Sequence, residues 1–172
     1  LILDQGYWPD GLLTAPSDDA LRRDVELTKA MGYNGARLHE KIFEPRFLYY
    51  CDREGYIVWG EHGNWGLDIA RADAWANFIP EWVECVERDF NHPSVIVFAF
   101  MNEFKSSDPK GKEIADALIR EIRAADSGRL VTFACNHNMD DISNANPDIV
   151  SFNTYPGWIG SDAGTFENQK QL

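Results

Sequence analysis

Short apolar segments alternate with longer amphipathic segments along the chain, and this alternation constrains the fold more than any other feature. Strands alternating with helices predict βαβ units and a parallel sheet. Several of the short segments are almost continuously apolar, as in strands covered on both faces. The predicted strands are Ile2–Gln5, Asn34–His39, Tyr56–Glu61, Val95–Glu103, Leu130–Asn136 and Ile149–Tyr155.

Four helices are predicted between these strands, and their ends carry recognisable signals. Ser17 can cap the first helix, with Asp18 and Asp19 in its first turn, and Gly32 can end it. The remaining predicted helices span 44–54, 72–90 and 109–125, and Gly55 can end the first of these three. Pro80, inside the third helix, predicts a kink or a fresh helix start.

Length and topology leave two architectures open at this point. A doubly wound open sheet can use six strands, whereas a closed (β/α)₈ barrel needs eight strands and typically ~250 residues. No linker or low-complexity segment divides residues 1–172, so we expect one domain.

Charge and cysteine content exclude several classes of function. The formal net charge is -12, which argues against binding the polyanionic backbone of nucleic acids. No stretch approaches the ~20 apolar residues of a membrane span. Three cysteines without a CxxC pair indicate buried thiols rather than a zinc site or disulfides. We expect a soluble protein and leave its compartment open, cytoplasmic or exported, because the chain does not begin with Met.

Polar residues follow five successive predicted strands at their carboxyl ends. In parallel α/β folds this edge of the sheet carries the active site. Nucleotide-binding glycine motifs, a GxSxG elbow and HExxH spacing are all absent from the sequence. The polar pairs are Arg37 and His39, Glu61 and His62, Asn102 and Glu103, Asn136 and His137, and Asn153 and Tyr155.

Glu103 is the sharpest candidate for catalysis, because an apolar strand carries its carboxyl group to the mouth of the sheet. A carboxyl there can act as a general acid, and Asn102 beside it can hold a substrate hydroxyl. Aromatic residues make up 13% of the chain, and Trp8, Trp65 and Trp158 lie near predicted turns. Their flat faces suit a sugar-binding cleft, although half-buried packing explains such residues equally well.

The segment Asn91-His92-Pro93-Ser94, followed by Val95–Met101 and then Asn102-Glu103, resembles the acid/base signature of glycoside hydrolase family 2. The spacing from Ser94 to the Asn-Glu pair is kept. Phe98, Ala99 and Met101 depart from the residues usual there. Residues 3–11 (LDQGYWPDG) and 19–40 resemble the first two barrel strands of this family. The resemblance implies a (β/α)₈ TIM barrel, of which the chain covers strands one to six.

The resemblance also implies roles for individual residues. Glu103 would be the general acid/base, Asn102 would bind the sugar 2-hydroxyl, Arg37 would support the ionised nucleophile, and Tyr155 would hydrogen-bond that nucleophile. Many members carry Arg-x-x-His after strand two, whereas this chain has Arg37-Leu38-His39. The expected residues of the cleft wall and sugar pocket are His39, Glu61, Trp65, Asn136, Trp158 and Trp8.

The second carboxylate of a retaining glycosidase is not evident in the sequence. In this family the nucleophile is a Glu that ends strand seven, expected near position ~185 at ~30 residues per βα unit. Glu167 lies in a polar stretch, GTFENQKQL, that no strand precedes. We therefore expect residues 1–172 to be a partial catalytic barrel without turnover of its own, whose open sheet edges favour self-association.

The sequence favours retaining hydrolysis of an O-β-glycosidic bond, as in β-galactosidases and β-glucuronidases, with a carbohydrate as the partner. The mechanism implies no cofactor, although some family members bind Mg²⁺ or Na⁺. Three alternatives stay open: an endo-acting β-mannanase or cellulase type, an inactive carbohydrate-binding barrel, and a complete six-stranded open sheet that acts as an interaction module.

Overall fold

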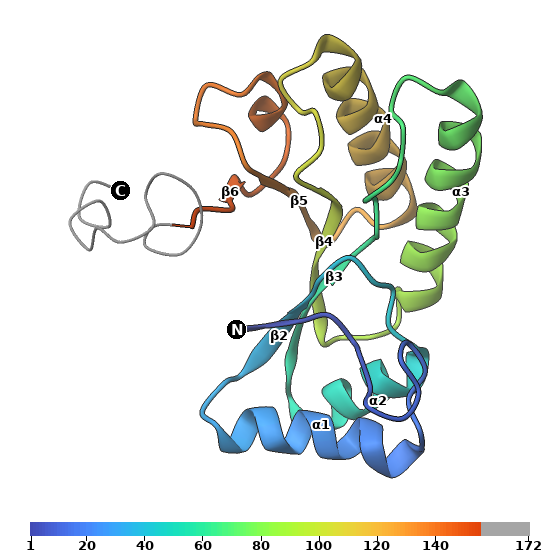
Figure 1. Ribbon diagram of the computed structural model, residues 1–172, viewed down its shortest axis with the longest axis vertical. Coiled ribbons are helices and arrows are strands. Elements are labelled where there is room, and N and C mark those ends of the chain that lie inside the picture. Colours follow the sequence, from blue (N-terminus) through green and yellow to red (C-terminus); the bar gives the residue numbers. More distant parts are fainter. Residues whose placement is uncertain (156–172) are drawn as a thin grey trace, which may run out of the picture.

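Six parallel strands form one sheet in the computed structural model, which describes residues 1–155 (Figure 1). The spatial order is β1-β2-β3-β4-β5-β6, and every neighbouring pair is parallel. All six predicted strands are confirmed, with somewhat shorter bounds. They are β1 (Ile2–Asp4), β2 (Gly35–Leu38), β3 (Ile57–Glu61), β4 (Val95–Asn102), β5 (Leu130–Cys135) and β6 (Ser151–Phe152).

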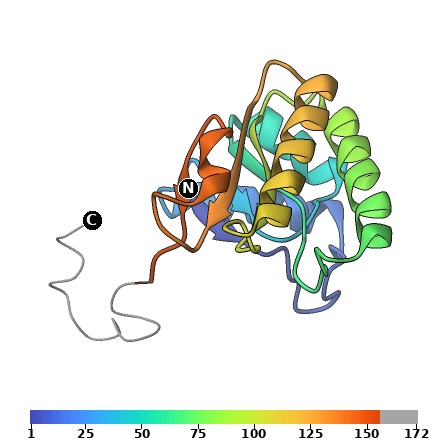
Figure 2. The same cartoon turned by 90° about the horizontal axis from the view of Figure 1, so that it is seen from above.

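The helices lie along one side of the curved sheet, as Figures 1 and 2 show. They are α1 (Asp18–Ala30), α2 (Pro45–Glu54), α3 (Ala72–Asp89) and α4 (Pro109–Ala125), and a short 3₁₀ helix, η1 (Ile142–Ala145), precedes β6. A doubly wound sheet reverses its strand order at a switch point, whereas strict sequential order with helices on one side is the barrel arrangement. The structure therefore favours a partial barrel over the open sheet.

The predicted helix ends are confirmed by their caps. The Ser17 hydroxyl accepts a hydrogen bond from the backbone N–H of Ala20 at 3.1 Å. Gly55 ends α2 in the left-handed conformation, with φ of 61°. Of the two alternatives predicted at Pro80, the fresh helix start is wrong, because α3 continues through this residue; the kink stays a prediction. Buried side chains on both sides of Pro80, such as Phe78 and Trp82, pack against the core and hold the helix together.

The apolar core lies between the sheet and these helices. Its rings include Trp82, which meets Phe98 edge-on, and the cluster of Phe100, Phe104 and Phe133. All three cysteines carry free thiols; Cys51 and Cys135 are buried and Cys85 is half-buried. Within residues 1–155 no helix has the length and apolar character needed to span a membrane.

The segment Asn91-His92-Pro93-Ser94 anchors the amino end of β4 to α2. Asp52 of α2 accepts a hydrogen bond from the backbone N–H of Ser94 at 2.9 Å, and its other oxygen lies 2.6 Å from Nδ1 of His92. This contact ties α2 to the start of β4 and so fixes the strand that delivers Asn102 and Glu103 to the opposite edge.

Candidate active site

Asn102 lies at the centre of the polar cluster at the carboxyl edge of the sheet. It is 1% exposed, and its Oδ1 accepts hydrogen bonds from Arg37 Nη2 and Asn153 Nδ2, both at 2.8 Å. Asn64 clamps its backbone: the Asn102 N–H donates to Asn64 Oδ1 at 2.5 Å, and Asn64 Nδ2 donates to the Asn102 carbonyl at 2.9 Å. The Nδ2 group of Asn102 has no hydrogen-bond partner among residues 1–155, so it can donate to an oxygen of a ligand.

Glu103 leaves the strand in a left-handed backbone conformation, with φ of 47°. Its backbone N–H still donates to the carbonyl of Ala134 at 2.8 Å. Carboxyl oxygen Oε1 accepts hydrogen bonds from Asn153 Nδ2 at 2.7 Å and from the Tyr155 hydroxyl. Because both donors grip one oxygen, the rotamer of Glu103 is fixed, and within the described residues Oε2 is left to exchange a proton with a ligand.

The ion pair between Arg37 and Glu61 holds this cluster together. The Glu61 side chain is fully buried and accepts hydrogen bonds from Arg37 Nε at 2.6 Å and from the Glu40 backbone N–H at 3.1 Å. Arg37 contacts Oε2 of Glu61, whereas the Glu40 N–H contacts Oε1. Nδ1 of His39 lies 2.9 Å from the same Oε1. Burial alone would raise the pKa of Glu61, but the hydrogen bonds and charges of His39 and Arg37 hold that pKa below its ordinary value.

Arg37 joins four strands through one guanidinium group. Besides Glu61 on β3, it contacts Asn102 on β4 and donates from Nη1 to Asn153 Oδ1 at 3.1 Å, just after β6. Five hydrogen-bond donors in a rigid fork allow one arginine to do this. The structure thus brings together the predicted residues Arg37, His39, Glu61, Asn102, Glu103 and Tyr155.

Other predicted residues stand apart from this network. Asn136 is exposed and makes no hydrogen bond within residues 1–155. Trp8 is half-buried, and its backbone pairs with Leu12 in a tight loop. Trp65 is 71% exposed and borders the site. Trp158 and Glu167 lie outside the described residues.

His62 lies on the other side of the sheet from its neighbour Glu61. Its ring stacks on Phe78 of α3 with centroids 4.3 Å apart, and burial lowers its pKa to about 4. Successive strand residues point to opposite faces, so Glu61 faces the polar cluster and His62 faces the helices. His62, although it follows the same strand as Glu61, is therefore directed away from the polar cluster and packs against α3.

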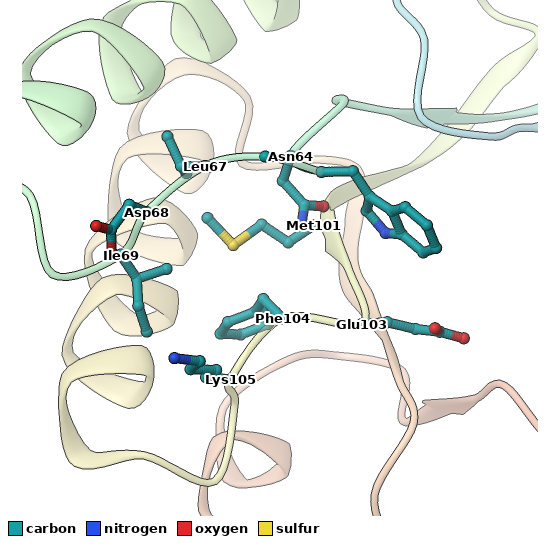
Figure 3. A pocket seen from close by; sticks show the side chains of 10 residues that line it. Asn64, Leu67, Asp68, Ile69, Met101, Glu103, Phe104 and Lys105 are labelled. Carbon is teal, nitrogen blue, oxygen red and sulfur yellow. The ribbon is translucent and has the colours of Figure 1, made fainter.

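A pocket of ≈ 320 Å³ opens next to the Glu103 backbone, between the loops that follow β3 and β4 (Figure 3). Met101, Phe104, Leu67 and Ile69 give it apolar walls. Figure 3 shows the Glu103 side chain pointing away from Met101 and Phe104. Residues 1–155 contain no group of three or more His, Cys, Asp and Glu side chains arranged to hold a metal ion.

Sequential parallel strands with helices on one side, and a polar cluster around Asn102 at the carboxyl edge, are the arrangement of a TIM-barrel domain. Residues 14–159 match the family model described as "Glycosyl hydrolases family 2, TIM barrel domain". The chain therefore belongs to glycoside hydrolase family 2.

Relatives within this family include glucuronidases and galactosidases. The chain is 29% identical over 144 residues to the β-glucuronidase of Canis lupus familiaris, covering 80% of this chain and 22% of the relative. A β-galactosidase of Bacteroides ovatus is 35% identical over 89 residues, which are 49% of this chain and 10% of that protein. The chain thus spans 22% of the length of the β-glucuronidase it matches.

Solved structures of the same family superpose closely on this chain. A β-galacturonidase from Eisenbergiella tayi bound to galacturonate has a TM-score of 0.79 and 27% identity, covering 91% of this chain and 29% of that one. Bacteroides uniformis β-glucuronidase 2, covalently bound to cyclophellitol-6-carboxylate aziridine, has a TM-score of 0.83 and 26% identity, covering 99% and 22%.

Two residues of the cluster escaped the sequence analysis, namely Asn64 and Glu40. Asn64 precedes Trp65 in a loop, and nothing in its sequence context marks an amide that will be buried against β4. Glu40 follows the predicted strand directly, and its proximity to Arg37 and His39 was the signal that could have found it.

Proposed function

We propose that this chain supplies the general acid/base and the sugar-holding residues of a retaining β-glycoside hydrolase. The observation that carries the proposal is the geometry of Glu103, whose Oε1 is gripped by Asn153 and Tyr155 beside the fixed amide of Asn102. Because its relatives are a β-glucuronidase, a β-galactosidase and a β-galacturonidase, we propose β-glucuronides, β-galactosides or β-galacturonides as the class of substrate.

The chemistry assigned to Glu103 is proton transfer in two steps. Protonated Oε2 donates its proton to the glycosidic oxygen as the bond to the sugar breaks, and the resulting carboxylate then takes a proton from the attacking water. Asn102 donates from Nδ2 to a hydroxyl of the sugar. Tyr155 and Asn153 are positioning residues for the carboxyl; the contact of Tyr155 with the nucleophile stays a prediction.

A retaining mechanism needs a second carboxyl group ~5–5.5 Å from the first. Within the described residues the cluster holds two further carboxylates. The oxygens of Glu61 are occupied by Arg37, His39 and the Glu40 backbone, whereas Oε2 of Glu40 is occupied by the backbone N–H groups of Asn64 and Trp65 and its Oε1 is buried. We therefore propose that the nucleophile comes from outside residues 1–155 and that residues 1–172 alone do not turn over substrate.

The test compares two polypeptides, the 172-residue chain and the product of the complete coding sequence that contains it. Both are assayed on nitrophenyl β-glucuronide, β-galacturonide and β-galactoside. In the complete product, Glu103→Gln should lower kcat by about 10²-fold or more, the size of general acid/base contributions. Glu113→Gln, at an exposed position of α4, is the matched control and should change little.

Two results would overturn the proposal. One is full activity of the complete product with Gln at position 103, and the other is hydrolysis by the isolated chain.

The carboxylate oxygens of Glu61 are occupied by hydrogen bonds, which also favours a second candidate function, a barrel that binds carbohydrate without cleaving it. Sugar binding together with no hydrolysis by the complete product would identify that function.

The sheet edges support a further expectation for the isolated chain. Within the described residues β1 pairs only with β2, and β6 pairs only with β5, so both leave backbone groups able to accept another strand. We propose self-association through these edges. Light scattering that shows a monodisperse monomer with a cooperative melt would contradict it.

A further inference from the structure

A second pocket, of ≈ 430 Å³, lies beside the acid/base rather than against it. Glu103 does not line this pocket, and Trp65 is the residue that lines both. Its volume falls within the roughly 300–1,000 Å³ of small-molecule sites. A molecule that reaches from Glu103 past Trp65 would enter it.

The pocket carries two exposed aromatic rings. Tyr7 is 68% exposed and Trp65 is 71% exposed, which leaves most of each ring open to solvent. Aromatic rings offer large contact area at low conformational-entropy cost, with a polar tip for hydrogen bonding. The C–H faces of a pyranose ring pack on such surfaces.

Both aromatic segments are tethered by charged residues that follow β2. Oε2 of Glu40 accepts hydrogen bonds from the backbone N–H groups of Asn64 at 2.8 Å and Trp65 at 3.1 Å. Nζ of Lys41 donates to the carbonyls of Gly6 and Leu13, both at 2.8 Å, and so closes the segment that carries Tyr7. The backbone segments that carry the two rings are therefore held in place, which lowers the entropy lost when a ligand binds.

Polar groups of the same pocket are left without partners. Oε1 of Glu40 is buried and accepts no hydrogen bond within residues 1–155, and burial raises the pKa of this carboxyl. Nδ1 of His39 is engaged with Glu61, so the ring presents Nε2. Glu40 also has a left-handed backbone, with φ of 56°, like Glu103. Strained backbone of this kind concentrates at ligand sites.

We propose that this pocket is a second sugar subsite, which binds a neutral pyranose ring on Tyr7 and Trp65 with hydroxyl contacts to Glu40 and His39. The subsite requires the Glu40 side chain to turn so that Oε1, which is buried, reaches a hydroxyl group of the ring. A uronate ring would place its carboxylate near Glu40, where like charges repel, and the Lys41 ammonium group of the same lining is already engaged with two backbone carbonyls. The inference rests on the proposed function and makes its substrate a β-linked oligosaccharide or a glycoside whose aglycone is a sugar.

The test is a titration of the 172-residue chain with sugars, in which binding is measured by calorimetry and by tryptophan fluorescence. The probes are methyl β-galactoside, methyl β-glucuronide and a panel of β-linked disaccharides that add a neutral or a uronate second ring. A disaccharide of the panel with a neutral second ring should bind at least tenfold more tightly than the matching monosaccharide. A disaccharide with a uronate second ring should bind less than threefold more tightly than the matching monosaccharide.

Variants assign the gain in affinity to the pocket. Trp65→Ala and Tyr7→Ala should each remove most of the disaccharide advantage, and Tyr7→Ala should leave monosaccharide affinity unchanged. Tyr49→Ala, at an exposed tyrosine of α2, is the matched control and should keep the full advantage. Far-UV circular dichroism and melting temperature establish that each variant is folded.

Two outcomes overturn the subsite. One is that no disaccharide of the panel binds tenfold more tightly than its monosaccharide, and the other is that the advantage persists in both Trp65→Ala and Tyr7→Ala. These results differ from a failure of the proposed function, which shows as absent hydrolysis by the complete product while disaccharide binding is intact.

Discussion

Replacing Glu61 by Gln should destabilise the fold strongly, because among residues 1–155 this carboxylate is the ion-pair partner of the half-buried Arg37 guanidinium. The Glu61 side chain is 0% exposed and that of Arg37 is 15% exposed, so solvent screens the pair little. Gln keeps the shape but removes the charge and replaces one acceptor by a donor. Breaking one partner of a buried pair costs about 3–5 kcal/mol. At about 2–4 °C per kcal/mol for a chain of this size, the melting temperature should fall by roughly 6–20 °C.

The assay is urea unfolding followed by far-UV circular dichroism, at several pH values. The folded-state pKa of Glu61 is lowered, so its contribution is fully present above the ordinary value of 4.5 and is lost as pH falls through the lower folded value. The gap between wild type and Glu61→Gln should therefore be constant near neutral pH and shrink below 4.5. A gap under about 1 kcal/mol at pH 7 would refute the reasoning, since this is an ordinary mutational effect.

Three further predictions concern local features. Gly111→Ala should lower the free energy of unfolding by about 1–3 kcal/mol in urea melts, because the new Cβ would lie 2.0 Å from the carbonyl oxygen of Lys105; unchanged stability would show that the α4 start can shift freely. Ser17→Ala should cost about 1 kcal/mol through loss of the α1 cap, measured the same way; a Ser17→Asp variant that fails to recover stability would count against the cap. Tyr155→Phe should lower kcat/KM of the complete product by roughly tenfold or more, because one hydrogen bond to the Glu103 carboxyl is lost; wild-type kinetics would remove Tyr155 from the site.

The elements of the fold could be predicted because each signal is local. Strand residues such as Val95–Met101 are apolar in an unbroken run, and helix ends carry Ser17 and Gly55. Of the two alternatives at Pro80, the fresh helix start is wrong because packing of α3 on both sides of this residue outweighs one missing hydrogen bond. The choice of a barrel over an open sheet depended on strand order, which no local pattern encodes.

The site could be predicted only where the chain leaves a strand. Side chains alternate between the two faces of a strand, which explains why Glu61 and His62 lie on opposite faces of the sheet. Asn102 and Glu103 escape this alternation because Glu103 turns into the left-handed region, which re-aims its carboxyl group. That turn and the hydrogen bonds between Asn64 and Asn102 depend on contacts between distant segments. The residues next to Asn102 and Glu103 in the sequence do not predict them.

The most direct test of the central assignment is azide rescue of Glu103→Ala in the product of the complete coding sequence. An activated nitrophenyl β-glycoside needs no protonation of its leaving group, so the variant should still form a glycosyl-enzyme, which then turns over slowly for want of a general base. Azide should restore turnover and yield the β-glycosyl azide, identified by nuclear magnetic resonance. A variant that hydrolyses unactivated glycosides at the wild-type rate, or that gives only the α-azide, would contradict Glu103 as the acid/base of a retaining enzyme.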